Sequence, residues 1–157
     1  MTSTETKPLT MWTCDTCGEG ITLADAGKAL VTWRHDDQGR GYDFRIVHKN
    51  MNDRRCDPEY ASGFMLHTEL SMFLGDKGLA YALGLLSDGP IKGGESAVRV
   101  ADFDSFTDLV RRVQTPWYEE ARPFWNTEHT QHWLADASES YPYMPDVLER
   151  IAKQDLG

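Results

Sequence analysis

The chain has 157 residues, a length that suits one compact domain able to fold without cross-links. Apolar residues make up 40% of it and aromatic residues 11%, a composition that excludes intrinsic disorder. The net charge is −9, and residues 66–157 hold 15 acidic and 8 basic side chains. Because an acidic chain is repelled by phosphate groups, we expect another protein, and not nucleic acid, as the partner.

The cysteine content and the polar N-terminal residues predict a reducing compartment. Three cysteines are too few, and odd in number, for the disulfide scaffold of a secreted domain. The first ten residues, MTSTETKPLT, lack the apolar stretch of a signal peptide. The longest apolar run, near residues 79–86, is too short to span a bilayer. We therefore expect a cytoplasmic protein that is not attached to a membrane.

A β-hairpin is predicted in the first third of the chain. Apolar and polar residues alternate over residues 29–34 and again over residues 42–47, and the segment between them, HDDQGRG, is rich in turn formers. We expect a flexible tail over residues 1–10 and a small β head over residues 11–60.

Beyond this head the apolar spacing becomes helical, and we expect a helical body of about five helices over residues 61–157. The expected helices cover residues 68–74, 77–87, 103–115, 128–138 and 145–154, with a short or kinked helix at residues 117–125 and a short strand at residues 97–101. The second is apolar on nearly all sides, which predicts a buried central helix. Asp104 or Ser105 can cap the third. The fold class is α+β, with head and body packed as one compact unit.

The stretch WTCDTCGEG contains a pair of cysteines, Cys14 and Cys17, separated by two residues. A redox pair of this spacing places its first thiolate at a helix N-terminus. Here Gly18 and Gly20 follow the pair, and two glycines within three residues favour a tight turn. Such a turn is typical of a metal-binding knuckle, in which a glycine after the second cysteine accepts a positive φ. The pair is predicted to be half of a zinc site.

The other half is expected in RIVHKNMNDRRCDP, where His48 ends a predicted strand and Cys56 follows eight residues later. Three sulfurs and one nitrogen close a tetrahedral structural zinc site, with a head similar to a zinc ribbon or treble clef. His35 or Asp57 could take the place of His48, and Cys56 could instead be an inert thiol. The expected ligands of this structural Zn²⁺ are Cys14, Cys17, His48 and Cys56.

The segment TPWYEEARPFW combines aromatic and charged residues, and it could be either core or a partner-binding surface. We expect its rings to pack inward and its glutamates to face solvent. Neighbouring glutamates on a helix point about 100° apart, so they would not act on one substrate atom. The candidate partner-binding residues are Trp117, Tyr118, Glu119, Glu120 and Arg122.

Three motifs together carry a resemblance: W-x-C-x-x-C-G at the head, I-V-H-K followed by C-D, and R-R-x-x-x-P-W-Y-E-E-A-R. The chain resembles small uncharacterised zinc-knuckle proteins of high-GC, actinobacterial-type bacteria and their phages. The resemblance covers residues 12–57 and 100–125, and it implies zinc binding but no established activity. Pro123 departs from the more continuous helix that the resemblance implies.

No catalytic set of residues emerges from the sequence. Our leading hypothesis is a zinc-stabilised, non-catalytic cytoplasmic protein that binds another protein as a regulatory or accessory factor. The alternative is a nucleic-acid-binding protein of the transcription-regulator type, which would use the zinc head and the pair Arg54 and Arg55. An enzyme of unknown reaction is the third hypothesis.

Overall fold

The computed structural model describes residues 5–59, 63, 66–91 and 97–157. The strands are β1 Met11–Thr13, β2 Gly20–Thr22, β3 Ala29–His35, β4 Gly41–His48 and β5 Leu66–Glu69. The α-helices are α1 Gly75–Leu86, α2 Phe103–Gln114, α3 Tyr118–Ala121, α4 Glu128–Trp133 and α5 Pro145–Lys153. Short 3-10 helices are η1 Leu23–Lys28, η3 Leu70–Phe73, η4 Arg122–Phe124 and η5 Tyr141–Tyr143.

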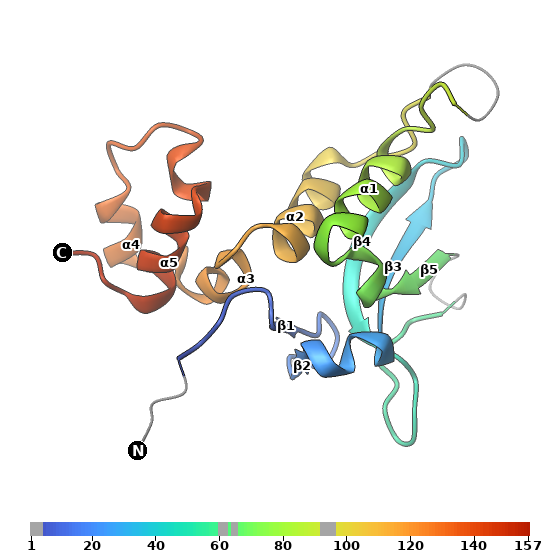
Figure 1. Cartoon of the computed structure of the whole chain (residues 1–157), viewed down its shortest axis with the longest axis horizontal. Helices are drawn as coiled ribbons and strands as arrows, with labels where there is room; N and C mark the ends of the chain where they lie inside the picture. The colour runs from blue at the N-terminus through green and yellow to red at the C-terminus, as the bar shows by residue number, and fades with distance from the viewer. Residues whose placement is uncertain (1–4, 60–62, 64–65, 92–96) are drawn as a thin grey trace.

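The fold is mixed α+β, as expected, with two small antiparallel sheets among the described residues. Figure 1 shows α1 and α2 beside the larger sheet and α4 and α5 at the opposite end of the molecule, with α3 between α2 and α5. The β1–β2 pair lies between these two parts. Head and helices therefore form a continuous structure, in which the small sheet occupies the middle.

The smaller sheet is the antiparallel pair of β1 and β2, and the turn between them carries both cysteines of the C-x-x-C motif. Trp12 pairs with Ile21 across the two strands, and each side chain is 1% exposed. Since alternate residues of a strand point to opposite faces, each three-residue strand buries only its middle side chain. These two side chains anchor the turn to the core.

The larger sheet has the strand order β4-β3-β5. The predicted hairpin is confirmed as β3 and β4, which pair from Ala29 opposite His48 to His35 opposite Gly41. His48 and His35 therefore lie at opposite ends of the hairpin. Because of this separation, only one of the two histidines can lie beside the cysteine turn.

The third strand, β5, lies where the sequence predicted the start of a helix. Residues 66–69 pair with β3, with Leu30 opposite Glu69, and the 3-10 helix η3 follows at once. Leu70 and Phe73, which suggested the helical period, are fully buried beneath the sheet edge. The helix prediction was wrong because pairing along the open edge of β3 outweighs the local helical spacing. The boundary expected at residues 60 and 61 therefore does not separate sheet from helices.

The helix α1 was predicted within two residues, but its expected burial was wrong. Only Gly78 and Ala82 are buried, whereas Leu79 is 45% and Leu83 is 56% exposed. One narrow face of α1 packs on η3 and α2, and the opposite face is open to solvent. The apolar composition of α1 thus reflects an uncovered face and not a central position.

Smaller differences concern the ends of the other helices. The cap of α2 is Asp102, whose side chain accepts a hydrogen bond from the Ser105 backbone N–H at 3.1 Å, and neither expected residue serves as the cap. The helix α4 ends at Trp133, five residues before the expected end. The strand expected at residues 97–101 is reduced to isolated bridges. The short helix expected at residues 117–125 is observed as α3 and η4, and α5 also agrees with expectation.

Part of the expected N-terminal tail belongs to the fold. Leu9 packs against the main core, and the Thr10 carbonyl accepts a hydrogen bond from the Leu23 backbone N–H at 2.8 Å. Positions 1–4 of the expected tail lie outside the described residues. So do positions 60–62, 64 and 65 around the expected boundary.

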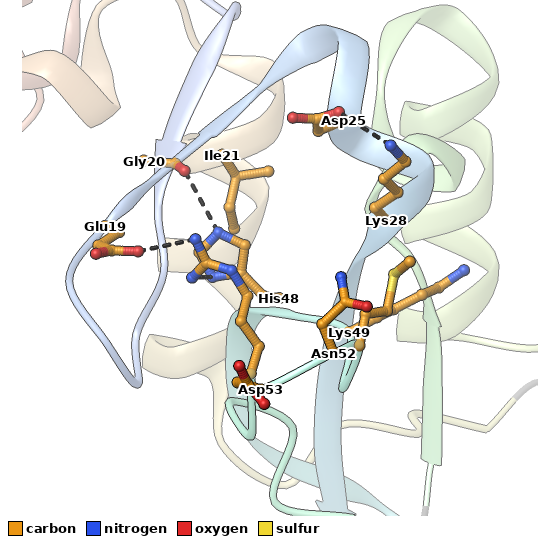
Figure 2. Close-up of a pocket in the computed structure, with 11 residues that line it drawn as sticks. Glu19, Gly20, Ile21, Asp25, Lys28, His48, Lys49, Asn52 and Asp53 are labelled. Carbon is orange, nitrogen blue, oxygen red and sulfur yellow. Dashed lines mark hydrogen bonds and ion pairs between the residues drawn. The ribbon is translucent and has the colours of Figure 1, made fainter.

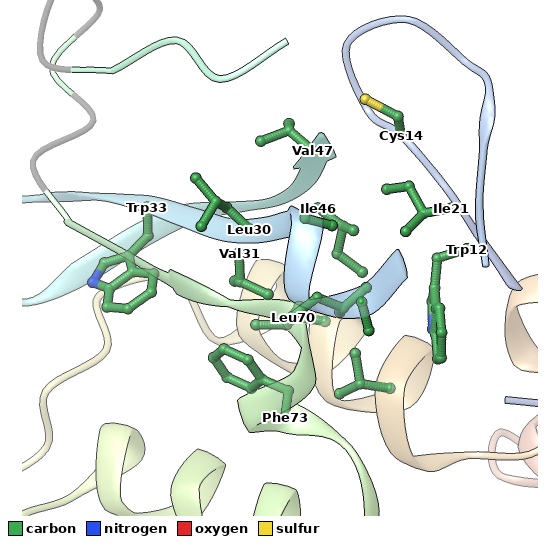
Figure 3. Packing of buried hydrophobic residues seen from close by; sticks show 14 of the residues in the cluster. Trp12, Cys14, Ile21, Leu30, Val31, Trp33, Ile46, Val47, Leu70 and Phe73 are labelled. Carbon is green, nitrogen blue, oxygen red and sulfur yellow. The ribbon is translucent and has the colours of Figure 1, made fainter. Parts of the chain in front are cut away.

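Two clusters of buried residues hold the fold together. The main cluster joins both sheets to α1 and α2, and Figure 3 shows Trp12 and Ile21 of the small sheet in the same cluster as Ile46 of β4. The second cluster joins α3 to α5 through residues such as Tyr118 and Ile151. The transition between the clusters falls between α2 and α3.

A buried charge, Arg112 of α2, spans this transition. Its side chain is 3% exposed, and it donates hydrogen bonds of 2.8 Å to both carboxylate oxygens of Glu119. It also donates to Asp15 Oδ2 at 2.7 Å and to the Thr13 carbonyl at 2.8 Å. Two of these partners flank Cys14 in the knuckle. One guanidinium thus fastens α2, α3 and the cysteine turn to one another.

The electrostatics of this network favour a permanently charged guanidinium. Burial alone would lower the pKa of Arg112, but the carboxylates of Glu119 and Asp15 outweigh it, and the pKa is raised above its usual range. The Trp12 Nε1–H donates to the Arg112 carbonyl at 2.9 Å, which ties the helix backbone to β1 as well. Removal of the Arg112 charge would leave the buried carboxylate of Glu119 with the partly buried Arg122 in place of a bidentate guanidinium.

We predict that Arg112→Met lowers the free energy of unfolding by about 3–5 kcal/mol, because the buried Glu119 carboxylate loses its bidentate partner and Asp15 loses its ion pair. Urea denaturation measures this loss. Arg99→Met is the control, since Arg99 forms a surface ion pair with Asp88, and we expect a change of at most about 1 kcal/mol. Equal small losses for both variants would show that the network does not stabilise the fold.

Two glycines of α1 give a second, matched prediction. A Cβ at Gly78 would lie 2.0 Å from the Phe73 carbonyl carbon, so Gly78→Ala forces the backbone apart and should cost about 1–3 kcal/mol. At Gly84 a Cβ would meet no atom of the described chain within 4 Å, and Gly84→Ala should stabilise the helix by about 1 kcal/mol. Thermal unfolding of both variants compares them, and effects of the same sign would contradict the packing of α1.

Candidate metal centre

The C-x-x-C motif forms the tight turn that its glycines predict. The Gly18 backbone N–H donates to the Cys14 carbonyl at 2.9 Å, and the Cys14 backbone N–H donates to the Glu19 carbonyl at 2.9 Å. Gly18 has a φ of 77°, a conformation that costs other residues about 1 kcal/mol or more. The turn directs both cysteine side chains toward the same side.

The second half of the centre comes from the end of β4 and the loop that follows it. Thr16 Oγ1 of the knuckle donates to the Cys56 carbonyl at 2.7 Å, which holds this loop against the first. Asn50 closes the loop by accepting from the Asp57 backbone N–H at 2.9 Å and donating to the Asp57 carbonyl at 3.1 Å. The polar side chains of the two loops thus bring distant parts of the chain together.

The side-chain donor atoms of four residues lie within 4.8 Å of one another, and these residues are Cys14, Cys17, His48 and Cys56. Ligands of a tetrahedral zinc ion are roughly 3.3–3.8 Å apart, and the Cys17 Sγ to His48 Nδ1 distance is 3.5 Å. The cluster contains neither His35, at the far end of the hairpin, nor Asp57, whose carboxylate accepts from the Glu59 backbone N–H. The structure thus assembles a site that can hold a metal ion.

The imidazole of His48 is oriented by its second nitrogen. Its Nδ1 faces the sulfur atoms, and its Nε2 lies 3.4 Å from the Gly20 carbonyl oxygen, a contact drawn in Figure 2. A metal-binding histidine usually donates its other ring N–H to a carbonyl or carboxylate, which fixes the tautomer. The position of Gly20 therefore suits a neutral His48 that offers Nδ1 to a metal.

The three thiols sit in different electrostatic surroundings. Burial raises the pKa of Cys56 to about 11, and its neighbours Cys17 and Cys14 add to the effect. The backbone N–H of Glu19 lowers the pKa of Cys17 below its ordinary value. Three thiolates this close repel one another, so a cation at their centre is required to keep all of them charged.

The centre has a closed side and an open side. Cys14 and Cys56 are 2% and 6% exposed, whereas the Cys17 side chain is solvent-exposed. Arg54 lies at the open side, where its Nη1 is 3.6 Å from the Cys17 sulfur and 3.3 Å from His48 Nδ1. Of the three cysteines, Cys17 is therefore the one that solvent and solutes can reach.

A cavity of about 570 Å³ adjoins this open side, and Figure 2 shows its lining. Its cations are paired: Lys28 with Asp25 at 3.8 Å, Lys49 with Glu69 at 2.9 Å and Arg54 with Glu19 at 2.8 Å. The guanidinium of Arg55 donates to two backbone carbonyls of its own loop. These engaged cations weaken the case for nucleic-acid binding through the pair at 54 and 55.

The candidate partner-binding segment at residues 117–122 is largely interior. Tyr118 is 3% exposed and donates from its hydroxyl to Asp108 Oδ1. The expectation of a solvent-facing Glu119 was wrong, since it is 8% exposed and also accepts from Arg122 at 3.2 Å. Sequence reasoning missed Arg112 because nothing in its local pattern marks a buried charge.

The two remaining residues of this segment are partly buried. Trp117 adopts a left-handed backbone with a φ of 70°, and the Lys153 ammonium lies 5.0 Å from its ring centre. Both carboxylate oxygens of Glu120 are buried and have no hydrogen-bond partner among the described residues. Burial raises the pKa of Glu120 accordingly. The segment serves mainly as the joint between α2 and α5.

No helix within the described ranges combines the length and apolar character that crossing a membrane requires.

Comparisons with known proteins add no relative to this picture. No protein-family model matches the chain, and no curated protein or solved structure matches it either. The resemblance to zinc-knuckle proteins therefore stays a prediction, and the metal centre rests on its geometry.

Proposed function

We propose that the cluster binds one Zn²⁺ and that the metal is structural. Three thiolates and an imidazole form a soft donor set that favours zinc over the hard cations Mg²⁺ and Ca²⁺. The observation that carries the proposal is the convergence of Cys14, Cys17, His48 and Cys56 within 4.8 Å. The small sheet and the β3–β4 hairpin would then form a head similar to a zinc ribbon.

A zinc ion with four protein ligands has no coordination position left for water or substrate. This closed donor set supports a non-catalytic role. Unmodified thiolates persist in the reducing cytoplasm, which is the compartment we propose for the protein. In this view the zinc fixes the knuckle so that Asp15 stays in reach of Arg112, and through Arg112 it stabilises the joint with the helices.

The proposed activity is binding of another protein, as a regulatory or accessory factor. The burial of the 117–122 segment directs attention to a different surface, the open face of α1, made of Leu79, Ala80, Leu83 and Gly84. All four residues are exposed, and the helix carries no charged residue after Lys77. Contiguous apolar surface of this kind marks interaction sites. We call it the α1 face.

The chemistry of the partner follows from charge. The chain carries a net charge of −9, and residues 66–157, which include α1, hold 15 acidic and 8 basic side chains. A protein segment with apolar side chains flanked by basic ones would complement an apolar face on an acidic chain. A second copy of this acidic chain would bring like charges together instead. We therefore propose a basic, apolar segment of a different protein.

Purified protein should contain one zinc per chain, released by chelators. Native mass spectrometry and elemental analysis test the stoichiometry. Loss of zinc should unfold the head and weaken the Arg112 network, because structural zinc contributes several kcal/mol to folding in small zinc domains. The helical end should keep part of its circular dichroism signal.

Cys14→Ser and Cys56→Ser should each lower the melting temperature and abolish stable zinc binding. Ser71→Ala, on the exposed surface of η3, is the control and should do neither. Reduced wild-type protein that takes up no zinc, or serine variants that melt like the control, would rule out a structural metal.

Leu83→Glu tests the α1 face. The side chain is 56% exposed, so folding stability should change by no more than about 0.5 kcal/mol. Binding of a partner captured from a lysate of a high-GC bacterium should weaken at least about 30-fold, the equivalent of a 2 kcal/mol hot spot. Thr107→Glu, on the exposed side of α2, adds the same charge and should leave affinity nearly unchanged.

Sedimentation of the isolated protein completes this test. Concentration-dependent dimers that Leu83→Glu abolishes would replace the foreign partner with a second copy of the chain. Capture that proceeds equally well with both variants would exclude the α1 face as the binding surface.

A further inference from the structure

The loop between β4 and Cys56 places Arg54 directly on the open side of the metal centre. Its Nη1 lies 3.6 Å from Cys17 Sγ and 3.3 Å from His48 Nδ1, so one N–H group faces both exposed ligands. The Arg54 backbone N–H donates to the Met51 carbonyl at 3.0 Å, which fixes the start of the side chain. The loop therefore fixes the backbone from which this guanidinium extends.

The second arm of Arg54 reaches back to the knuckle. Its Nη2 lies 2.8 Å from Glu19 Oε2, two residues after Cys17, and this ion pair raises the pKa of Arg54. The side chain thus bridges the two loops that supply the ligands. Thr16 makes the other bridge, through the Cys56 carbonyl. The two loops are thus connected at two points, through Arg54 and through Thr16.

We propose that Arg54 is a positioning residue that retains the metal by holding the exposed Cys17 thiolate in place. This inference rests on the metal site proposed above. A metal on His48 Nδ1 uses the lone pair of that nitrogen, which leaves the Cys17 sulfur as the acceptor for Arg54. Three thiolates, a neutral imidazole and Zn²⁺ sum to a charge of −1, and the guanidinium neutralises it.

The exposure of the three cysteines explains why Arg54 would control the release of the metal. Cys14 and Cys56 are buried, so a chelator or alkylating reagent first meets Cys17. A hydrogen bond from a cation withdraws electron density from the sulfur and occupies the approach to it. Loss of the guanidinium should therefore speed both zinc release and thiolate alkylation, with little change in the fold.

The experiment compares metal retention in wild type, Arg54→Met, Arg54→Lys and Glu19→Gln, each loaded with zinc. The rate of zinc transfer to a chromogenic chelator should rise about 10-fold or more in Arg54→Met, the usual scale for losing an outer-shell partner. Arg54→Lys keeps the positive charge but cannot bind Cys17 and Glu19 through two separate nitrogens, and Glu19→Gln removes the ion pair of Nη2. The zinc-transfer rates of both variants should therefore lie between those of wild type and Arg54→Met. Alkylation of Cys17 by iodoacetamide should follow the same order.

Arg55→Ala is the control for loop stiffness, because its guanidinium donates only to the backbone carbonyls of Asn52 and Arg54 in the described contacts. The absorption spectrum of cobalt-loaded protein supplies a second measurement, which a change in loop stiffness alone would not alter. The thiolate-to-cobalt charge-transfer band should shift to longer wavelength in Arg54→Met, since a thiolate without its hydrogen bond is a stronger donor. It should keep its position in Arg55→Ala.

The outcomes separate the two proposals. Wild type that takes up neither zinc nor cobalt overturns the metal site and this inference together. Wild type that binds metal, with equal release rates and unshifted bands in Arg54→Met, overturns the role of Arg54 alone. Should Arg54→Met fail to fold, unchanged release from Glu19→Gln and Arg54→Lys would overturn it as well.

Discussion

A single buried guanidinium connects the parts of this protein. Arg112 compensates two carboxylates, one in the cysteine knuckle and one in α3, and a charge in this position is stable only while both partners stay in place. Asp15 Oδ2 also accepts from the Ile46 backbone N–H at 2.8 Å, which adds β4 to the same network. The knuckle, the hairpin and the helices therefore share one set of charged hydrogen bonds, and the proposed zinc ion braces it from the other side.

This arrangement gives the metal centre a consequence beyond its own loops. Asp15 lies between the two cysteines of the knuckle, so the ligands of the metal and the partner of Arg112 belong to the same tight turn. Loss of metal would release the turn and leave a buried cation short of one counter-charge. The open side of the centre, at Cys17, is where such a change would begin. A structural ion in this position can couple the head to the helical end without taking part in any reaction.

Sequence patterns captured features that depend on local chemistry. The knuckle was predictable because the spacing of the two cysteines and the following glycines allow few other structures, and His48 stood at the end of a strongly alternating strand. β5 was not predictable, since Leu70 and Phe73 fit a helix until the open edge of β3 is known. The burial of Glu119 was hidden for a similar reason: its partners lie 7 and 106 positions away along the chain, and no local period records them.

X-ray absorption at the zinc edge of the purified, reduced protein tests the central claim most directly. The account predicts one class of site, with three sulfur ligands at about 2.3 Å and one nitrogen at about 2.0 Å from the metal. The spectrum of Cys56→Ser should lose one sulfur from this shell. A shell of oxygen and nitrogen atoms, or a zinc content far below one per chain, would contradict the assembly of Cys14, Cys17, His48 and Cys56 into a metal centre.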